Sequence, residues 1–203
     1  MKKFGIVLPL FALALAISGC GEGETVTKKL SVYPFNTAVV RYELSGAVSG
    51  EETLYIKGDM SVDQKFVTQG GADENTLELN VGPEIYIADL LKMTAVKVVN
   101  DDYSKLIKLS PEDQKKEFIR TALGIKDSAE LPVSSGTKQI AGQSCDVYII
   151  DNVGTACLWN GIILEKEISL LGITNTKTAI SVETNVDIPK DQFDLPAGVI
   201  VKN

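Results

Sequence analysis

The sequence predicts an α+β domain that is mainly β, with a helical insert between two groups of antiparallel strands. Short β-rich segments follow one another, separated by turn signals such as Gly58-Asp59 and Gly82-Pro83. One strong helix signal interrupts them near residue 110, and strand signals then resume. The chain has 203 residues, which suits one domain with a sizeable core.

Six strands are expected before the helical insert. Residues 40–45 alternate apolar and polar side chains, which is the period of a strand with one wet face. Residues 69–75 form a loop by composition. The other strands of this half are expected at 53–57, 60–68, 77–81, 84–88 and 93–99. Their close spacing predicts an antiparallel meander.

The helical insert is expected to hold two helices. The stronger one begins at the N-cap Ser110, has Pro111 at its first position and ends at Gly124. A shorter helix is expected over 103–109, with Asp101 or Asp102 as its cap. After the insert, strands are expected at 138–140, 144–150, 155–159, 163–170 and 176–183. A short helical turn and an apolar segment, 199–201, close the chain.

The N-terminal segment has the order of an export signal. Lys2 and Lys3 precede an apolar run over 4–17, and Ser18 and Gly19 stand before Cys20. The run is too short to span a bilayer, which needs roughly 20 apolar residues. Residues 1–19 therefore read as a signal peptide, residues 20–31 as a Gly- and charge-rich tether, and residues 32–203 as the folded domain.

The signal resembles that of bacterial lipoproteins, in which residues 17–20 would be the lipobox. The resemblance implies that Cys20 is diacylated on sulfur, becomes the N-terminus and is then acylated on nitrogen. Such acyl chains, palmitate among them, anchor a protein stably when two or more are present. Gly21 is not the aspartate that resembles an inner-membrane retention signal, which favours the outer membrane, on its periplasmic or surface face. An ordinary secretory peptide is the alternative.

Charge and composition exclude several classes of function. The net charge is −7, and removal of Lys2 and Lys3 leaves 18 basic against 27 acidic residues, or −9. This balance argues against binding to nucleic acid. The chain has no histidine, which removes the common nucleophile pairs and zinc ligands. We therefore expect no enzyme, no metal and no cofactor; a carboxylate-based hydrolase is the remaining catalytic alternative.

Two further cysteines, Cys145 and Cys157, are expected on neighbouring strands. If Gly154 takes the left-handed position of a three-residue hairpin loop, the cysteines lie four residues apart along the ladder. That separation is roughly 13 Å, beyond the roughly 7 Å limit for a disulfide. Two buried thiols are the favoured expectation. A hairpin centre two residues nearer the N-terminus would pair the cysteines directly, and an oxidising compartment would then favour a disulfide.

Several short runs resemble a family of uncharacterised bacterial lipoproteins that is similar in organisation to the lipoprotein carriers of the LolA and LolB type. The runs lie at 54–59, 85–90, 140–148, 159–164 and 188–199. The resemblance implies a strongly curved antiparallel sheet, an unclosed half-barrel, with helices in its concavity. The helices at 103–123 would form a lid over an apolar cavity for acyl chains.

The function implied is a non-enzymatic, membrane-anchored envelope lipoprotein that binds a lipid, a lipoprotein or another apolar ligand under this lid. The loop around Gly172 is either an exposed apolar finger, with Leu171 beside it, or a hairpin tucked into the core. The alternative function is a structural or scaffolding lipoprotein that engages a protein partner. The expected cavity lining consists of Tyr42, Leu44, Leu106, Ile107, Phe118, Ile119, Ala122 and Trp159.

Overall fold

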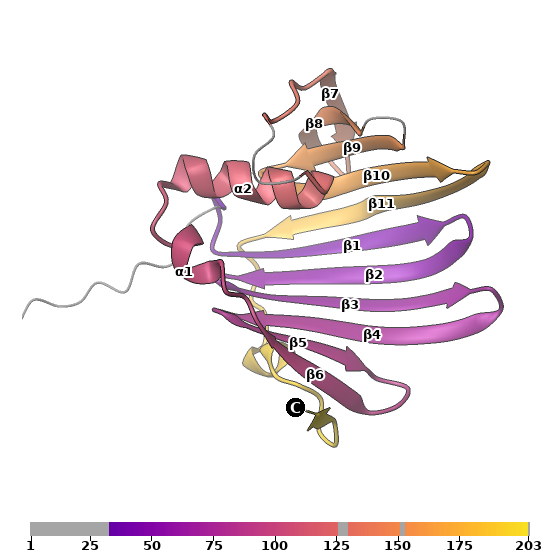
Figure 1. Cartoon of the computed structure of the whole chain (residues 1–203), viewed down its shortest axis with the longest axis vertical. Coiled ribbons are helices and arrows are strands. Elements are labelled where there is room, and N and C mark those ends of the chain that lie inside the picture. The colour runs from indigo at the N-terminus through magenta and orange to yellow at the C-terminus, as the bar shows by residue number, and fades with distance from the viewer. Residues whose placement is uncertain (1–32, 126–129, 151–152, 203) are drawn as a thin grey trace, which may run out of the picture.

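A computed structural model describes residues 33–125, 130–150 and 153–202. The predicted signal peptide and the whole tether, which includes Cys20, lie outside the described residues. The described part is one curved sheet with two helices on its concave face (Figure 1). None of its helices is long and apolar enough to cross a membrane.

The first half of the sheet is the expected meander of six strands joined by tight hairpins. Residues 69–75, expected as a loop, are instead mostly strand. Gly70 and Gly71 have φ angles of 58° and 82°, which allows a two-residue hairpin turn, and the next strand begins at Ala72. The strands are β1 (Thr37–Ser45), β2 (Val48–Lys57), β3 (Met60–Gln69), β4 (Ala72–Val81), β5 (Glu84–Asp89) and β6 (Thr94–Val99).

Two helices follow, α1 (Tyr103–Leu106) and α2 (Pro111–Leu123). The predicted cap of α2 is confirmed, because Ser110 Oγ accepts a hydrogen bond from the Asp113 backbone N–H at 3.1 Å. Gly124 closes α2 with a left-handed φ of 70°.

The prediction that Asp101 or Asp102 caps α1 is confirmed for the position alone, because the Asp102 side chain makes no capping hydrogen bond. Asp102 stands at the N-cap position, but its own backbone is helical, whereas a capping side chain needs an extended backbone. The Asp102 carboxylate instead pairs with Lys105 at 2.6 Å. α1 is also shorter than the expected 103–109 and ends at Leu106.

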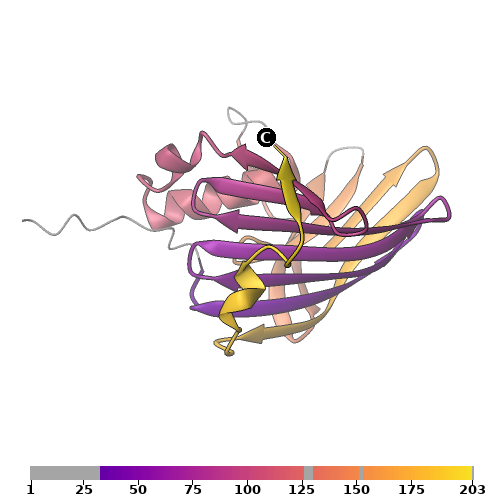
Figure 2. The ribbon, with the colours of Figure 1, turned by 90° about the horizontal axis from the view of Figure 1, so that it is seen from below.

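The second half returns to the sheet. Its elements are β7 (Gly136–Ile140), β8 (Gln143–Ile150), β9 (Gly154–Trp159), β10 (Ile162–Leu170), β11 (Ile173–Thr184), the 3-10 helix η1 (Lys190–Phe193) and β12 (Ile200–Lys202). The twelve strands are ordered β12-β6-β5-β4-β3-β2-β1-β11-β10-β9-β8-β7. Neighbouring strands are antiparallel except β12, which pairs with β6 in parallel. The curved, unclosed, mainly β half-barrel that the sequence predicts is confirmed (Figures 1 and 2).

The two faces of the sheet are covered by different parts of the chain. The C-terminal segment runs along the convex face, where Ile188 and Phe193 pack against Val62 and Leu79 (Figure 2). On the other face, Leu123 at the end of α2 packs against a cluster with Tyr148, Ala156 and Leu158. The end of α2 therefore packs on the concave face, and the C-terminal segment packs on the convex face.

The expectation of two unpaired thiols is wrong, because Cys145 and Cys157 form a disulfide. Cys157 lies across from Val147, two residues from Cys145, and the cysteine Cα atoms are 5.4 Å apart. The expected register placed Cys157 opposite Ile149. The difference arises at Gly154, whose backbone is extended with φ 159° instead of left-handed. A Cβ there would meet Glu167 O at 1.8 Å, so the glycine is needed for a close approach to β10.

Candidate functional site

A pocket of about 590 Å³ lies between the helices and the ends of strands β2 to β5. Its upper wall comes from α1 and α2 and the segment between them, and its floor from residues of the sheet. Because successive strand residues point to opposite faces, the pocket receives alternate residues of β4, Glu78 and Asn80, whereas β3 contributes both Met60 and Ser61 at its start. The two walls differ in chemistry.

The upper wall has an apolar part and is held on the sheet by aromatic contacts. Leu106, Leu109 and Phe118 line it. The Phe118 ring meets Tyr33 edge-on with centroids 6.0 Å apart, and Tyr33 stacks on Phe35 at 5.2 Å. Phe35 stacks in turn on Trp159 at 5.2 Å, which links α2 to β9. Burial raises the pKa of Tyr33 to about 12, so its phenol is neutral at physiological pH.

The floor carries polar side chains in its middle. Ser61 on β3 and Asn80 on β4 are directly paired across the strands, and Asn80 Nδ2 donates to Ser61 Oγ at 3.3 Å. Glu78, two residues from Asn80, also lines the pocket. Ile56 and Ile85 flank this group from β2 and β5. A ligand would therefore meet the apolar side chains of Leu106, Leu109 and Phe118 above and a polar strip below.

The turn between β2 and β3 forms one edge of the pocket. The Tyr103 hydroxyl donates to Asp59 Oδ2 at 3.3 Å, which ties the start of α1 to this turn. Partial burial and the negative charge of Asp59 raise the pKa of Tyr103. The contact holds the shorter helix over the floor.

Leu106 and Phe118 are the two expected lining residues that the structure places in the pocket. Ile119 and Ala122 instead pack on the cluster around Leu123. Ile119 is rotated about 100° from Phe118 around the helix, and Ala122 lies one turn nearer to Leu123. The other four expected residues, Tyr42, Leu44, Ile107 and Trp159, also lie outside the lining.

Sequence reasoning missed the polar floor. The alternation in residues 77–81 does place Glu78 and Asn80 opposite Leu77 and Leu79. Periodicity alone does not say which of the two faces the helices cover. The polar face is the one that they cover.

An apolar stripe continues from the pocket along β5 and β6. Ile85 pairs with Val98, and Ile87 pairs with Val96, on the same face as the pocket floor. Ile87, Val96 and Val98 are 45%, 46% and 46% exposed. Half-exposed apolar side chains beside a pocket offer a path for a chain too long to fit inside it.

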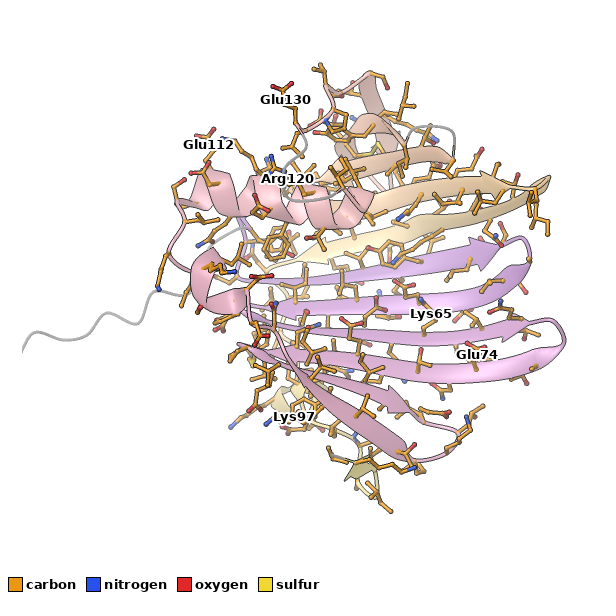
Figure 3. The ribbon with its side chains drawn as sticks, viewed as in Figure 1. Lys65, Glu74, Lys97, Glu112, Arg120 and Glu130 are labelled. Atoms are coloured by element: carbon orange, nitrogen blue, oxygen red, sulfur yellow. A yellow bond between two sulfur atoms is a disulfide. The ribbon has the colours of Figure 1, made fainter. Side chains whose placement is uncertain are left out.

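A buried ionic cluster lies further along the concave face. Glu52 is 2% exposed and pairs with Lys177 and, at 3.4 Å, with Lys65. Lys177 Nζ also lies 4.1 Å from the Tyr42 ring. Lys65 sits along β3, well away from both helices (Figure 3). The cluster is therefore separate from the pocket wall formed by α2.

The pKa values of the two acids of this cluster, Glu52 and Asp63, are shifted in opposite directions. Burial and the negative charge of Glu52 raise the pKa of Asp63 to about 7. Burial also acts to raise the pKa of Glu52, but Lys177 and Lys65 hold it below its usual value. Asp63 hydrogen-bonds Glu52, while its Oδ1 is buried without a hydrogen-bond partner among the described residues. The pair thus holds one proton, on Asp63, up to about neutral pH.

The tip of the β10–β11 hairpin is apolar and exposed. Leu171 is fully exposed, and Leu170 and Ile173 are more than half exposed. Leu171 and Gly172 form the turn with φ angles of 53° and 81°. Of the two expectations for this loop, the structure supports the exposed finger.

The fold defines a class: a curved, unclosed antiparallel half-barrel with helices in its concavity. A solved structure of an uncharacterized conserved protein from Thermus thermophilus shares it, with a TM-score of 0.52 and 7% identity over 83% of this chain and 91% of that one. Similarity at this level of identity shows the fold alone. No family model matches the chain, and no curated protein matches it.

Two further solved structures contain the protein MucB. The complex of Pseudomonas aeruginosa MucA and MucB aligns with a TM-score of 0.44 and 13% identity over 80% of this chain and 56% of that one. MucB in complex with MucA(peri) aligns with a TM-score of 0.38 and 14% identity over 83% and 57%. A TM-score below 0.5 does not establish a common fold, so MucB has no bearing on the function of this chain.

Proposed function

We propose that this protein is a membrane-tethered envelope lipoprotein that binds a lipid, an acyl chain or another apolar ligand and catalyses no reaction. The observation that carries the proposal is the pocket of about 590 Å³ under Leu106, Leu109 and Phe118. Its volume falls within the range of about 300–1,000 Å³ typical of small-molecule sites. Apolar surface buried there would contribute about 25 cal/mol per Å² to binding.

A pocket with two walls suits an amphipathic ligand. The apolar part would lie against the helices and run out along the stripe of Ile87, Val96 and Val98. The polar part would meet Ser61 and Asn80, whose hydrogen-bonding groups need partners when water is displaced. This division supports a lipid with a short polar end over a purely apolar molecule.

Membrane attachment is proposed through Cys20. The motif over 17–20 is the feature that supports it, together with the Gly-rich tether over 20–31. Intact-protein mass spectrometry tests it: acyl chains should add their mass to the wild type, and Cys20→Ala should lack that mass and leave the membrane fraction. If the wild type has no acyl mass, the tether is refuted. The outer membrane is the proposed location.

The absence of enzymatic activity is supported by the chemistry available in the chain. There is no histidine to activate a hydroxyl or thiol. Cys145 and Cys157 are in a disulfide. Glu52 pairs with Lys65 and Lys177 and has Asp63 beside it, whereas a hydrolase needs two carboxylates that face each other across a substrate.

Native mass spectrometry of the purified protein tests ligand binding. The wild type should carry an apolar ligand from cells. Ser61→Phe, which fills the floor, should lose it, and Ser144→Phe, at an exposed position of β8, should keep it. If Ser61→Phe retains the ligand as the wild type does, the pocket is not the binding site.

A second function is favoured by the exposed hairpin tip. Leu171 is an exposed apolar side chain that a protein partner could cover. A scaffolding lipoprotein would require such a contact surface. A photo-crosslinking residue at position 171 tests this in whole cells. One defined protein adduct, with no ligand in the pocket, would favour the scaffolding role.

A further inference from the structure

The charged side chains around the pocket are mostly acidic. Four carboxylates line it, from Asp59, Glu78, Asp102 and Glu117, against one lysine, Lys105. A carboxylate in a ligand would meet this negative surface at a cost, whereas a cation would be attracted. The negative charge of the pocket therefore favours a ligand whose polar end is positively charged.

Two of the four carboxylates have a cationic partner already. Asp102 pairs with Lys105 at 2.6 Å, and Glu117 pairs with Arg120 at 2.9 Å. The other two, Asp59 and Glu78, form no ion pair within the described part of the chain. Asp59 accepts a hydrogen bond from Tyr103, and Glu78 accepts one from Asn80 Nδ2 at 3.2 Å. These neutral donors leave both negative charges uncompensated.

The two uncompensated carboxylates stand at opposite ends of the polar strip. Asp59 precedes β3, and Glu78 lies on β4 beyond the Ser61–Asn80 pair. Strand spacing puts them roughly 13 Å apart, with the strip between them. Lys65 lies further along β3, but it already pairs with Glu52. A positive group on the strip would therefore lie no more than roughly 7 Å from one of the two carboxylates.

The geometry points to a cationic amphipath as the ligand: an apolar chain that bears an amine or ammonium group, with the chain under Leu106 and Phe118 and the nitrogen at Asp59 or Glu78. This inference rests on the proposed function, because it assigns the chemical class of the ligand in the same pocket. An ammonium donates up to three hydrogen bonds, which suits one of the two carboxylates together with a neighbouring acceptor such as Ser61. A fatty acid would bring a second negative charge beside them and would be disfavoured.

Photolabelling of the full chain in phosphatidylcholine nanodiscs tests the inference. Three probes share one twelve-carbon, diazirine-bearing chain and differ in their end group: a primary amine, an alcohol or a carboxylate. Peptide mass spectrometry measures the label on the segments that carry Ser61 and Phe118. Variants are Asp59→Asn and Glu78→Gln, with Asp187→Asn and Glu43→Gln as exposed controls. Comparing each variant with the wild type for the same probe cancels partition into the lipid.

We expect the amine to label the pocket more than the carboxylate does, and each pocket variant to lower amine labelling about threefold, the effect of one lost ion pair at a solvent-exposed site. Alcohol labelling should not change, which shows that the variants are folded, and the controls should match the wild type. Equal or stronger labelling by the carboxylate, or amine labelling that the variants leave unchanged, would overturn the cationic preference while leaving the proposed function intact. Absence of pocket labelling by all three probes would overturn the proposed function as well.

Discussion

Asp63→Asn is expected to remove most of the pH dependence of stability between pH 5 and pH 8. In the folded protein, burial and Glu52 raise the pKa of Asp63 from an ordinary 3.8 to about 7. Between these two values the folded state holds a proton that the unfolded chain has lost. Stability is therefore fully present below the unfolded pKa and is lost as the pH rises through the folded one.

The size of this loss of stability follows from the difference between the folded and unfolded pKa values of Asp63. Each pH unit between the two pKa values costs about 1.4 kcal/mol, which gives nearly 3 kcal/mol between pH 5 and pH 8. Asp63 is partly exposed, and Lys65 lies close by, so we expect about 2 kcal/mol after screening. With a urea dependence of about 2 kcal/mol per M, the unfolding midpoint of the wild type should fall by about 1 M.

Urea unfolding followed by circular dichroism at pH 5, 6, 7 and 8 measures this effect. The chain has no histidine, so no other side chain ordinarily titrates in the window. An asparagine amide can donate to Glu52 as the protonated Asp63 does, so the variant should match the wild type only below about pH 4 and should exceed it by a growing margin from pH 5 to pH 8. Asp187→Asn, an exposed control, should follow the wild type. If the unfolding midpoints of the wild type and of Asp63→Asn change with pH in parallel, Asp63 does not hold the additional proton of the folded state.

Two further predictions concern the disulfide and the N-cap of α2. Cys145→Ser should lower the free energy of unfolding by about 3 kcal/mol, because the disulfide to Cys157 closes a loop across a sequence separation of 12 residues; equal unfolding midpoints with and without reductant in the wild type would contradict this. Ser110→Ala should cost about 1 kcal/mol, since it removes the acceptor for the Asp113 N–H, while Ser110→Asp should keep most of the stability. If alanine and aspartate give the same midpoint, the cap contributes nothing.

Local chemistry made the strands and the α2 boundaries predictable. Pro111 and Gly124 mark the ends of α2 through effects that depend on their immediate neighbours. Gly70 and Gly71 fix a hairpin in the same way, although the loop expected around them was too long. These signals act over a few residues, which is the range that a sequence pattern reports.

Features that depend on distant segments were not predictable in the same way. The pairing of β12 with β6 joins segments about 100 residues apart, and no local pattern specifies its parallel direction. The register of β8 and β9 depends on the contact of Gly154 with Glu167 on a third strand. The polar floor of Ser61, Glu78 and Asn80 became visible only once the position of the helices was known. The candidate site thus depends on tertiary packing more than the fold class does.

A crystal structure of the protein purified with its natural ligand would test the central claim most directly. The account predicts ligand density between Leu106 and Phe118 above and Ser61 and Asn80 below, continuing toward Val98. Native mass spectrometry of the same sample would establish that the ligand is present. A ligand found outside this space, with the side chains of α1 and α2 filling the pocket, would contradict it.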